Sequence, residues 1–328
     1  MRKKLLTLGI GIFCTVMLVS CGNKKSTSTE GTIDGRGLKA VLSMSDASDL
    51  FRKNLGDAAL EAAAASGMEL TLEDAAGSMQ KQMNDIKNAK DVDVIICALC
   101  DSKTAQAMET NANGIPIVFI NSCPEDDYLK ANKYVYVGSN EEVAGQLQAE
   151  YILDKYASKD TINVAILKGE KRHSATKGRT AAVKYTLAES GKNINYVFDD
   201  YADWSTDKAK EVFDIFSNTG QQIDCVLCNN DNMALGAIEG AKQKNIDLSQ
   251  MLVLGVDATD GGVTAVEAGD MACTIFQSAK GQGEAAVKAA ITLAKDGDIA
   301  SLEGGEENSK YLWVPFESVT AENVSNYK

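Results

Sequence analysis

The chain of 328 residues has only three prolines and a single histidine, and it carries no excess of positive charge. So few prolines exclude long proline-rich disordered segments. A formal net charge of −13 is repelled by phosphate backbones, so we expect no nucleic-acid partner. The sequence also lacks a Gly-x-Ser-x-Gly motif, so a nucleophilic triad would have to use that one histidine, His173. A secreted hydrolase is therefore the weakest alternative, and we expect no enzyme activity and no catalytic residue.

Residues 1–20 have the features of a cleaved signal peptide. A positive segment, Arg2-Lys3-Lys4, precedes a mostly apolar stretch over residues 5–19. This stretch is shorter than the roughly 20 residues that a membrane-spanning helix needs. A positive segment followed by a short apolar one is typical of secretory signals.

The end of this segment, Leu18-Val19-Ser20-Cys21, resembles the lipobox of bacterial lipoproteins. The resemblance implies that Cys21 is lipidated and becomes the first residue of the mature chain. Two or more acyl chains hold a protein at a bilayer, because each buried CH₂ contributes about 0.8 kcal/mol. We expect residues 21–36 to form the lipid anchor and a flexible polar tether, and the protein to be extracytoplasmic and bound to the cell membrane through its lipid. An ordinary secretory signal and an uncleaved anchor are the alternatives.

Six cysteines follow this segment, and four of them form two Cys-x-x-Cys pairs that superficially suggest a zinc site. Both pairs lie within or at the ends of apolar, strand-like runs, where residues three apart face opposite sides of a sheet. We therefore favour buried core thiols, with disulfides or a metal site as alternatives, and expect no cofactor and no bound metal. The cysteines are Cys97, Cys100, Cys123, Cys225, Cys228 and Cys273.

From residue 37 onward, short apolar runs alternate with longer segments of helical periodicity. The expected strands are residues 38–44, 92–98, 115–120, 134–137, 163–167, 225–228, 252–256 and 273–276. The expected helices include residues 51–65, 80–88, 141–156 and 208–216. Such alternation predicts an α/β fold of parallel sheets covered by helices on both faces. About eleven strands are too many for one such sheet, so we expect two α/β lobes.

Ligands of open parallel sheets bind beyond the carboxyl ends of the strands, so the residues after each apolar run are the candidate site. Helix capping is the alternative explanation, because Asn and Asp are favoured caps in any α/β protein. Capping does not account for Phe51, Trp204, His173 or Arg179. The residues after the runs are Asp49, Phe51, Asp101, Asn121, His173, Asn229, Asn230, Asp231, Asp257 and Gln277.

A colinear series of motifs resembles the type I periplasmic binding proteins, and within them the galactose/glucose-binding proteins. The series comprises Lys168-Gly169-Glu170 followed by His173 and Arg179, Asp203-Trp204-Ser205-Thr206, residues 229–237, residues 254–258 and Trp313-Val314-Pro315-Phe316. The resemblance implies two Rossmann-like lobes joined by three hinge crossings, near Ser122, near residues 277–279 and near Tyr311. It places residues 37–122 and 278–310 in the N-terminal lobe, and residues 123–277 and 311–328 in the C-terminal lobe.

The resemblance also implies a function. The protein would be the substrate-binding lipoprotein of an ABC importer: a monomer that closes its lobes around a monosaccharide and delivers it to membrane permease subunits. Phe51 and Trp204 match the two aromatic residues between which this family holds the sugar ring. The polar residues expected around the ring are Asp49, His173, Arg179, Asn230, Asp257 and Gln277. Their donors and acceptors would satisfy hydroxyls whose burial without partners costs about 1–3 kcal/mol each.

Several positions depart from the family pattern. Ala98 and Ala175 stand where the family has polar residues, and Gln277 stands where an asparagine is usual. Asp46 competes with Asp49 as the contact after the first strand. The segment over residues 156–161 is too short and too poor in carboxylates to form the family's calcium loop.

These departures leave the sugar open, with a pentose, a deoxy sugar or a larger glycoside as candidates. A nucleoside or signalling furanose, or a sensory receptor partner, are alternative readings of the same fold. A transcriptional regulator is excluded, because residues 1–36 hold a signal and tether in place of a helix-turn-helix.

Overall fold

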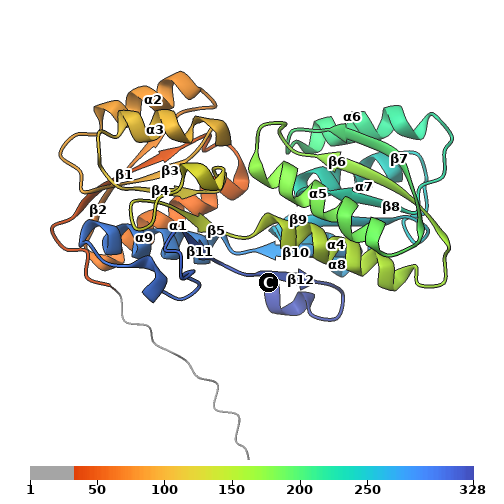
Figure 1. The fold of residues 1–328 in the computed structure, drawn as a ribbon. Coiled ribbons are helices and arrows are strands. Elements are labelled where there is room, and N and C mark those ends of the chain that lie inside the picture. Colours follow the sequence, from red (N-terminus) through yellow and green to blue (C-terminus); the bar gives the residue numbers. More distant parts are fainter. Residues whose placement is uncertain (1–32) are drawn as a thin grey trace, which may run out of the picture. The chain divides into compact units, whose positions relative to one another are not determined.

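Two six-stranded sheets organise residues 33–328, which are the residues that the computed structural model describes (Figure 1). The predicted signal peptide, Cys21 and most of the predicted tether lie outside the described residues. The observed α/β architecture confirms the predicted fold class.

The first sheet has the strand order β2-β1-β3-β4-β5-β11, and all of its strand pairs are parallel. Its strands are β1 Lys39–Met44, β2 Glu69–Asp74, β3 Val94–Ala98, β4 Ile117–Ile120, β5 Tyr134–Gly138 and β11 Tyr311–Trp313. The helices that pack on it are α1 Leu50–Ser66, α2 Met79–Asn88, α3 Ala105–Asn111 and α9 Ala279–Ala294. We call this sheet with its helices the first lobe.

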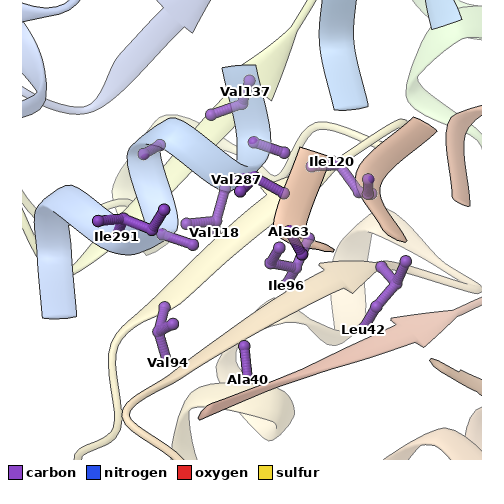
Figure 2. Close-up of a cluster of buried hydrophobic side chains, with 14 of the residues drawn as sticks. Ala40, Leu42, Ala63, Val94, Ile96, Val118, Ile120, Val137, Val287 and Ile291 are labelled. Carbon is purple, nitrogen blue, oxygen red and sulfur yellow. The ribbon is translucent and has the colours of Figure 1, made fainter. Parts of the chain in front are cut away.

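Both faces of the first sheet are covered, α2 and α3 lying on one face and α1 and α9 on the other (Figure 1). Successive residues of a strand point to opposite faces, so a strand in such a sheet is apolar throughout. In β3, Val94 and Ile96 belong to the cluster under α1 and α9, whereas Ile95 and Cys97 pack toward α2 and α3. Figure 2 shows the first of these clusters, in which Val118 of β4 lies beside Val287 of α9 and Ile96 of β3 lies beside Ala63 of α1.

The second sheet has the order β7-β6-β8-β9-β10-β12 and is parallel except for β12, which runs antiparallel to β10. Its strands are β6 Thr161–Lys168, β7 Asn193–Tyr201, β8 Cys225–Cys228, β9 Leu252–Asp257, β10 Cys273–Gln277 and β12 Phe316–Val319. Helices α4 Glu141–Lys155 and α5 Ser174–Glu189 pack on one face, and α6 Thr206–Ser217, α7 Asp231–Gln243 and α8 Asp260–Ala268 on the other. We call this sheet with its helices the second lobe.

Sheet membership corrects two of the expected lobe boundaries. Residues 123–138 and 311–313 were expected in the C-terminal lobe, but β5 and β11 pair within the first sheet. The chain therefore crosses between the lobes after Gly138, at Ser278 and after Trp313. The physical reason is that β5 continues the parallel ladder of β4, and β11 adds to its far edge.

The six cysteines that lie within residues 33–328 are free thiols. Cys225 and Cys228, three residues apart on β8, belong to clusters on opposite faces of the second sheet. Residues 33–328 contain no group of three or more His, Cys, Asp or Glu side chains arranged to hold a metal ion. None of the helices in this part of the chain has the length and apolar character needed to traverse a bilayer.

Candidate functional site

A cavity between the two lobes contains all eight residues predicted to bind a ligand. Its volume is about 30 Å³, well below the range of about 300–1,000 Å³ typical of small-molecule sites. The cavity lies at the carboxyl ends of the strands, where parallel sheets place ligands. Its lining residues are Asp49, Phe51, Arg52, Asn121, His173, Ala175, Arg179, Trp204, Asn230, Asp257 and Gln277.

Three of the polar lining residues, Asp49, His173 and Asn230, also cap helices. Asp49 Oδ1 accepts from the backbone N–H of Arg52 at 2.9 Å and begins α1. Asn230 Oδ1 accepts from the N–H of Met233 at 3.0 Å and begins α7. Each cap uses one side-chain atom, which leaves Asp49 Oδ2 and Asn230 Nδ2 for a ligand. Capping and ligand binding are therefore compatible at these positions.

Arg179 connects three elements of the second lobe. Its Nε donates to Glu141 Oε2 at 2.6 Å and its Nη2 to Gln277 Oε1 at 2.8 Å, while Nη1 donates to the carbonyl of Asn229. The arginine is 3% exposed. Three of its five N–H donors are used in this way, which leaves two for a ligand. The Gln277 Nε2 group is left free to donate as well.

Asp257 is a buried carboxylate whose partners are incomplete. Its Oδ1 lies 3.8 Å from Arg179 Nη1, beyond hydrogen-bond distance. Burial raises the pKa of Asp257 well above its ordinary value; Arg179 opposes the rise, and the carboxylates of Asp231 and Asp49 add to it. Hydroxyl groups donating to Asp257 would favour its ionised form. The residue is thus suited to a ligand with several hydroxyls.

The indole ring of Trp204, which lines the cavity, packs directly against Gly169. A Cβ atom at Gly169 would lie 2.2 Å from the indole ring, so no larger residue fits there. The ring also makes an edge contact with His173, with centroids 5.3 Å apart. The indole Nε1 of Trp204 is buried and has no protein partner.

Three lining residues have left-handed backbone conformations. The φ angles of Asn121, Trp204 and Asp257 are 60°, 63° and 112°. Non-glycine residues in such conformations are strained by about 1–3 kcal/mol each and cluster at functional sites. Asp257 departs furthest from ordinary geometry, at the end of β9. The strain is independent support for the cavity as a functional site.

His173 caps a helix, contrary to the expectation that capping would not explain it. Its Nδ1 accepts from the N–H of Ala175 at 3.1 Å and begins α5. Its Nε2 lies 3.1 Å from Asn121 Oδ1 of the first lobe. Burial lowers the pKa of His173 well below its ordinary value, and the charges of Arg52 and Arg179 lower it further. The ring is therefore neutral and lies at the contact between the lobes.

Arg52 is the lining residue that the sequence analysis missed. It lies in the first turn of α1, is 6% exposed, and its Nη2 donates to Glu170 Oε2 of the second lobe at 3.3 Å. A cation in the first turn opposes the helix dipole. The signal in the sequence was an arginine directly after Phe51, in the first turn of the expected helix. The charge of Arg52 needs a partner there, and the helix itself does not supply one.

Other expected residues lie outside the cavity. Asp46 accepts from Ser48 next to it, so Asp49 and not Asp46 lines the site. Asp101 caps a short 3₁₀ helix, and Asp231 accepts from Thr259 and Thr274. Neither acid is a lining residue.

The two alanines that stand where the family has polar residues lie in different places. Ala98 belongs to the core under α1 and α9, whereas Ala175 lines the cavity. Of the two, only Ala175 removes a polar group from the cavity wall.

Comparison with known proteins gives the family. Residues 40–298 match the family described as periplasmic binding protein domain. The chain belongs to the type I periplasmic binding proteins. They are non-catalytic solute-binding proteins, which agrees with the prediction of no enzyme activity.

Relatives cover most of this chain. A Rhizobium meliloti protein provisionally named as rhizopine-binding is 31% identical over 267 residues, 80% of this chain and 83% of the relative. A D-galactose/methyl-galactoside binding periplasmic protein of Haemophilus influenzae is 26% identical over 293 residues, 85% of this chain and 87% of its own. The predicted similarity to galactose-binding proteins is confirmed.

Among solved structures, an ABC transporter solute-binding protein from Bacillus halodurans with bound myo-inositol superimposes with a TM-score of 0.78. It is 31% identical and covers 90% of this chain and 98% of its own. A periplasmic solute-binding protein from Actinobacillus succinogenes with bound D-allose has a TM-score of 0.77 at 25% identity, covering 88% of this chain and 100% of its own.

Proposed function

We propose that the protein is the extracytoplasmic substrate-binding component of an ABC importer and that it binds one cyclic sugar or polyol between its lobes. The observation that carries this proposal is the cavity itself, where Phe51 of the first lobe and Trp204 of the second accompany a set of unfilled donors and acceptors. The proposed ligand contacts are Asp49, Phe51, Arg179, Trp204, Asn230, Asp257 and Gln277, with His173 beside them.

The chemistry of the lining fits a small polyhydroxylated ring. Each hydroxyl both donates and accepts, so a ring of hydroxyls needs carboxylates together with amide and guanidinium N–H groups. The carboxylates of Asp49 and Asp257 accept, and the Nδ2 of Asn230 and the guanidinium of Arg179 donate. The C–H faces of such a ring need apolar surface, which aromatic side chains supply. Buried acids on the wall disfavour a phosphorylated or carboxylated ligand.

The relatives support this class of ligand. The structure from Bacillus halodurans holds myo-inositol, and the one from Actinobacillus succinogenes holds D-allose. Both are described as solute-binding proteins of ABC transporters, which supports delivery of the ligand to a membrane permease. Contacts between the lobes at Glu170 and His173 support binding by lobe closure, because only the closed arrangement joins them to the first lobe.

Calorimetric titration with myo-inositol, D-allose, D-galactose, D-ribose and adenosine tests the ligand class. We expect saturable binding of at least one of the four polyols and none of adenosine. The Trp204→Ala variant should lose that binding, whereas Trp313→Phe, a change outside the cavity, should keep it. If only adenosine binds, the ligand class is a nucleoside and the proposal of a sugar or polyol is wrong. A polyol that binds Trp204→Ala unchanged would place its site elsewhere.

We also propose that Cys21 carries the lipid that holds the protein at the membrane. The support is the sequence Leu18-Val19-Ser20-Cys21 after an apolar stretch. Fractionation of cells that express the chain should find it in the membrane fraction. The Cys21→Ser variant should be released or remain unprocessed, and membrane attachment that survives this change would refute the lipid anchor.

A further inference from the structure

Contacts between the two lobes, away from the chain crossings, meet on one short loop. The loop over residues 169–173 joins β6 to α5 in the second lobe, and Ser174 is the first residue of α5. Glu170 accepts from Arg52, the carbonyl of Arg172 accepts from Ser102 Oγ at 3.3 Å, and the Ser174 hydroxyl accepts from the N–H of Cys123 at 2.8 Å. His173 lies within this series and bonds to Asn121.

The hydrogen bonds of His173 determine its tautomer. Nδ1 accepts from the backbone N–H of Ala175, so Nδ1 carries no proton. A neutral imidazole then carries its proton on Nε2, which donates to Asn121 Oδ1 at 3.1 Å. Both ring nitrogens are thus occupied by protein groups, and neither is left to bond a hydroxyl of the ligand.

Asn121 keeps a group that can bind a ligand. Its Oδ1 accepts from His173, whereas no hydrogen bond within residues 33–328 uses its Nδ2. Asn121 lines the cavity, is 7% exposed and has a φ of 60°. An asparagine in this strained conformation, with its oxygen fixed by a partner, has one defined orientation of its amide N–H₂ group.

We propose that His173 is a positioning residue: it fixes the Asn121 amide across the cleft, and Asn121 donates to the ligand. His173 itself contributes the edge contact with Trp204 and no hydrogen bond to the ligand. The inference rests on the proposed function, since it assigns a role within the same cavity. The hydrogen bond between His173 and Asn121 couples lobe closure to ligand recognition. The amide N–H₂ group of Asn121 is oriented only when the second lobe brings His173 to it.

Nitrogen NMR tests the geometry directly, because His173 is the only histidine in the chain. Protein labelled with ¹⁵N in the imidazole, prepared without a histidine tag, is measured alone and with saturating myo-inositol. We expect a protonated Nε2 and an unprotonated Nδ1. The Asn121→Ala variant should shift the Nε2 resonance, and Asn54→Ala, at an exposed position of α1, should not. A proton on Nδ1, or an Nε2 resonance that Asn121→Ala leaves unchanged in both samples, would overturn the proposal.

Two variants of His173 separate its role as the cap of α5 from its hydrogen bond to Asn121. His173→Asn keeps an oxygen that can cap α5 but is too short to reach Asn121, whereas His173→Gln can still donate at about the Nε2 position. We expect His173→Asn to weaken myo-inositol binding about tenfold, and His173→Gln to weaken it less. Melting temperatures of both variants show whether the fold is retained.

A double-mutant cycle decides between positioning and direct contact. If His173 acts through Asn121, the Asn121→Ala variant and the double variant with His173→Asn should both lose about tenfold in affinity. If His173 and Asn121 each contacted the ligand independently, their losses would multiply and the double variant would lose about a hundredfold in affinity. That result would overturn the proposal. Failure of myo-inositol to bind the unaltered protein would count against myo-inositol as the ligand, and the NMR comparison with Asn121→Ala is then made with the polyol that does bind.

Discussion

The two lobes contribute to the cavity in different ways. Of the lining residues, Asp49, Phe51, Arg52 and Asn121 come from the first lobe, and the other seven come from the second. In the second lobe Arg179 is the centre of a hydrogen-bond network that joins the lining residue Gln277 to Glu141 and to the carbonyl of Asn229. In the first lobe Arg52 and Asn121 find side-chain partners only across the cleft.

This difference indicates a division of labour. A network buried in one lobe keeps its geometry when the lobes separate, so the second lobe holds a preformed half-site. The first lobe completes the site on closure, because its polar groups gain their partners only then. Preorganisation of one half lowers the cost of ordering side chains when a ligand binds. The predictions that follow test this asymmetry, from the largest expected effect to the smallest.

Removing the centre of the second-lobe network should have the largest effect. Arg179→Met leaves the buried Glu141 carboxylate without its cation, and burial alone already raises the pKa of Glu141. Breaking a buried pair in this way costs about 3–5 kcal/mol of unfolding free energy. Urea denaturation measures it, with Lys177→Ala at an exposed position of α5 as the control. A loss as small as that of the control would contradict a network built around Arg179.

The aromatic residues should differ in their contribution to affinity. Trp204→Ala removes a larger ring that also contacts His173, so we expect polyol affinity to fall about a hundredfold, as for a binding hot spot. Phe51→Ala removes the first-lobe ring alone and should cost about tenfold. Calorimetry on both variants gives the ratio, and a Phe51→Ala loss exceeding that of Trp204→Ala would reverse the proposed asymmetry.

Affinity should depend on pH through Asp257. Its pKa in the ligand-free fold lies well above 3.8, because of burial. A ligand that donates to the carboxylate binds its ionised form, so binding releases a proton below that raised pKa. Affinity should therefore rise as the pH increases and level off once the pH exceeds the raised pKa. Titrations across this range should give a flat profile for Asp257→Asn, and an equally steep profile in that variant would exclude Asp257 as the titrating group.

The ion pair between the lobes should have the smallest effect. The Glu170 side chain is 43% exposed, so solvent screens its attraction to Arg52. Exposed pairs contribute about 0.2–1 kcal/mol, and Glu170→Gln should lower polyol affinity by less than about fivefold. Glu303→Gln, the same change at an exposed position outside the cavity, is the matched control. The affinity loss of Glu170→Gln should become smaller in high salt. A loss that salt leaves unchanged would mean that Glu170 does not act through its ion pair with Arg52.

Much of the fold could be predicted from apolar patterning. The eight expected strands are all present, and the expected strand over residues 225–228 coincides with β8. The sequence did not reveal β2, β7, β11 and β12, which are the four edge strands of the two sheets. The faces of β2 and β7 are largely exposed, so these two strands lack a continuous apolar run, and β11 and β12 have only three and four residues. The lobe boundaries failed at β5 and β11, because sheet membership depends on pairing between distant segments, which local patterns do not encode.

The candidate site could be predicted largely by resemblance and by the position of residues after strands. The eight predicted residues line one cavity. The sequence could not show that His173 caps α5 and bonds to Asn121, since both contacts depend on three-dimensional geometry. Arg52 was missed because a charged residue in a helix is ordinarily solvated, and only the structure shows that it is buried.

A crystal structure of the protein saturated with the tightest-binding polyol tests the account most directly. We predict that the ring lies between Phe51 and Trp204, with hydroxyls bonded to Arg179 and Asp257 on the second-lobe side and to Asn121 on the first. A polyol found outside this cavity, or contacting one lobe only, would contradict the account.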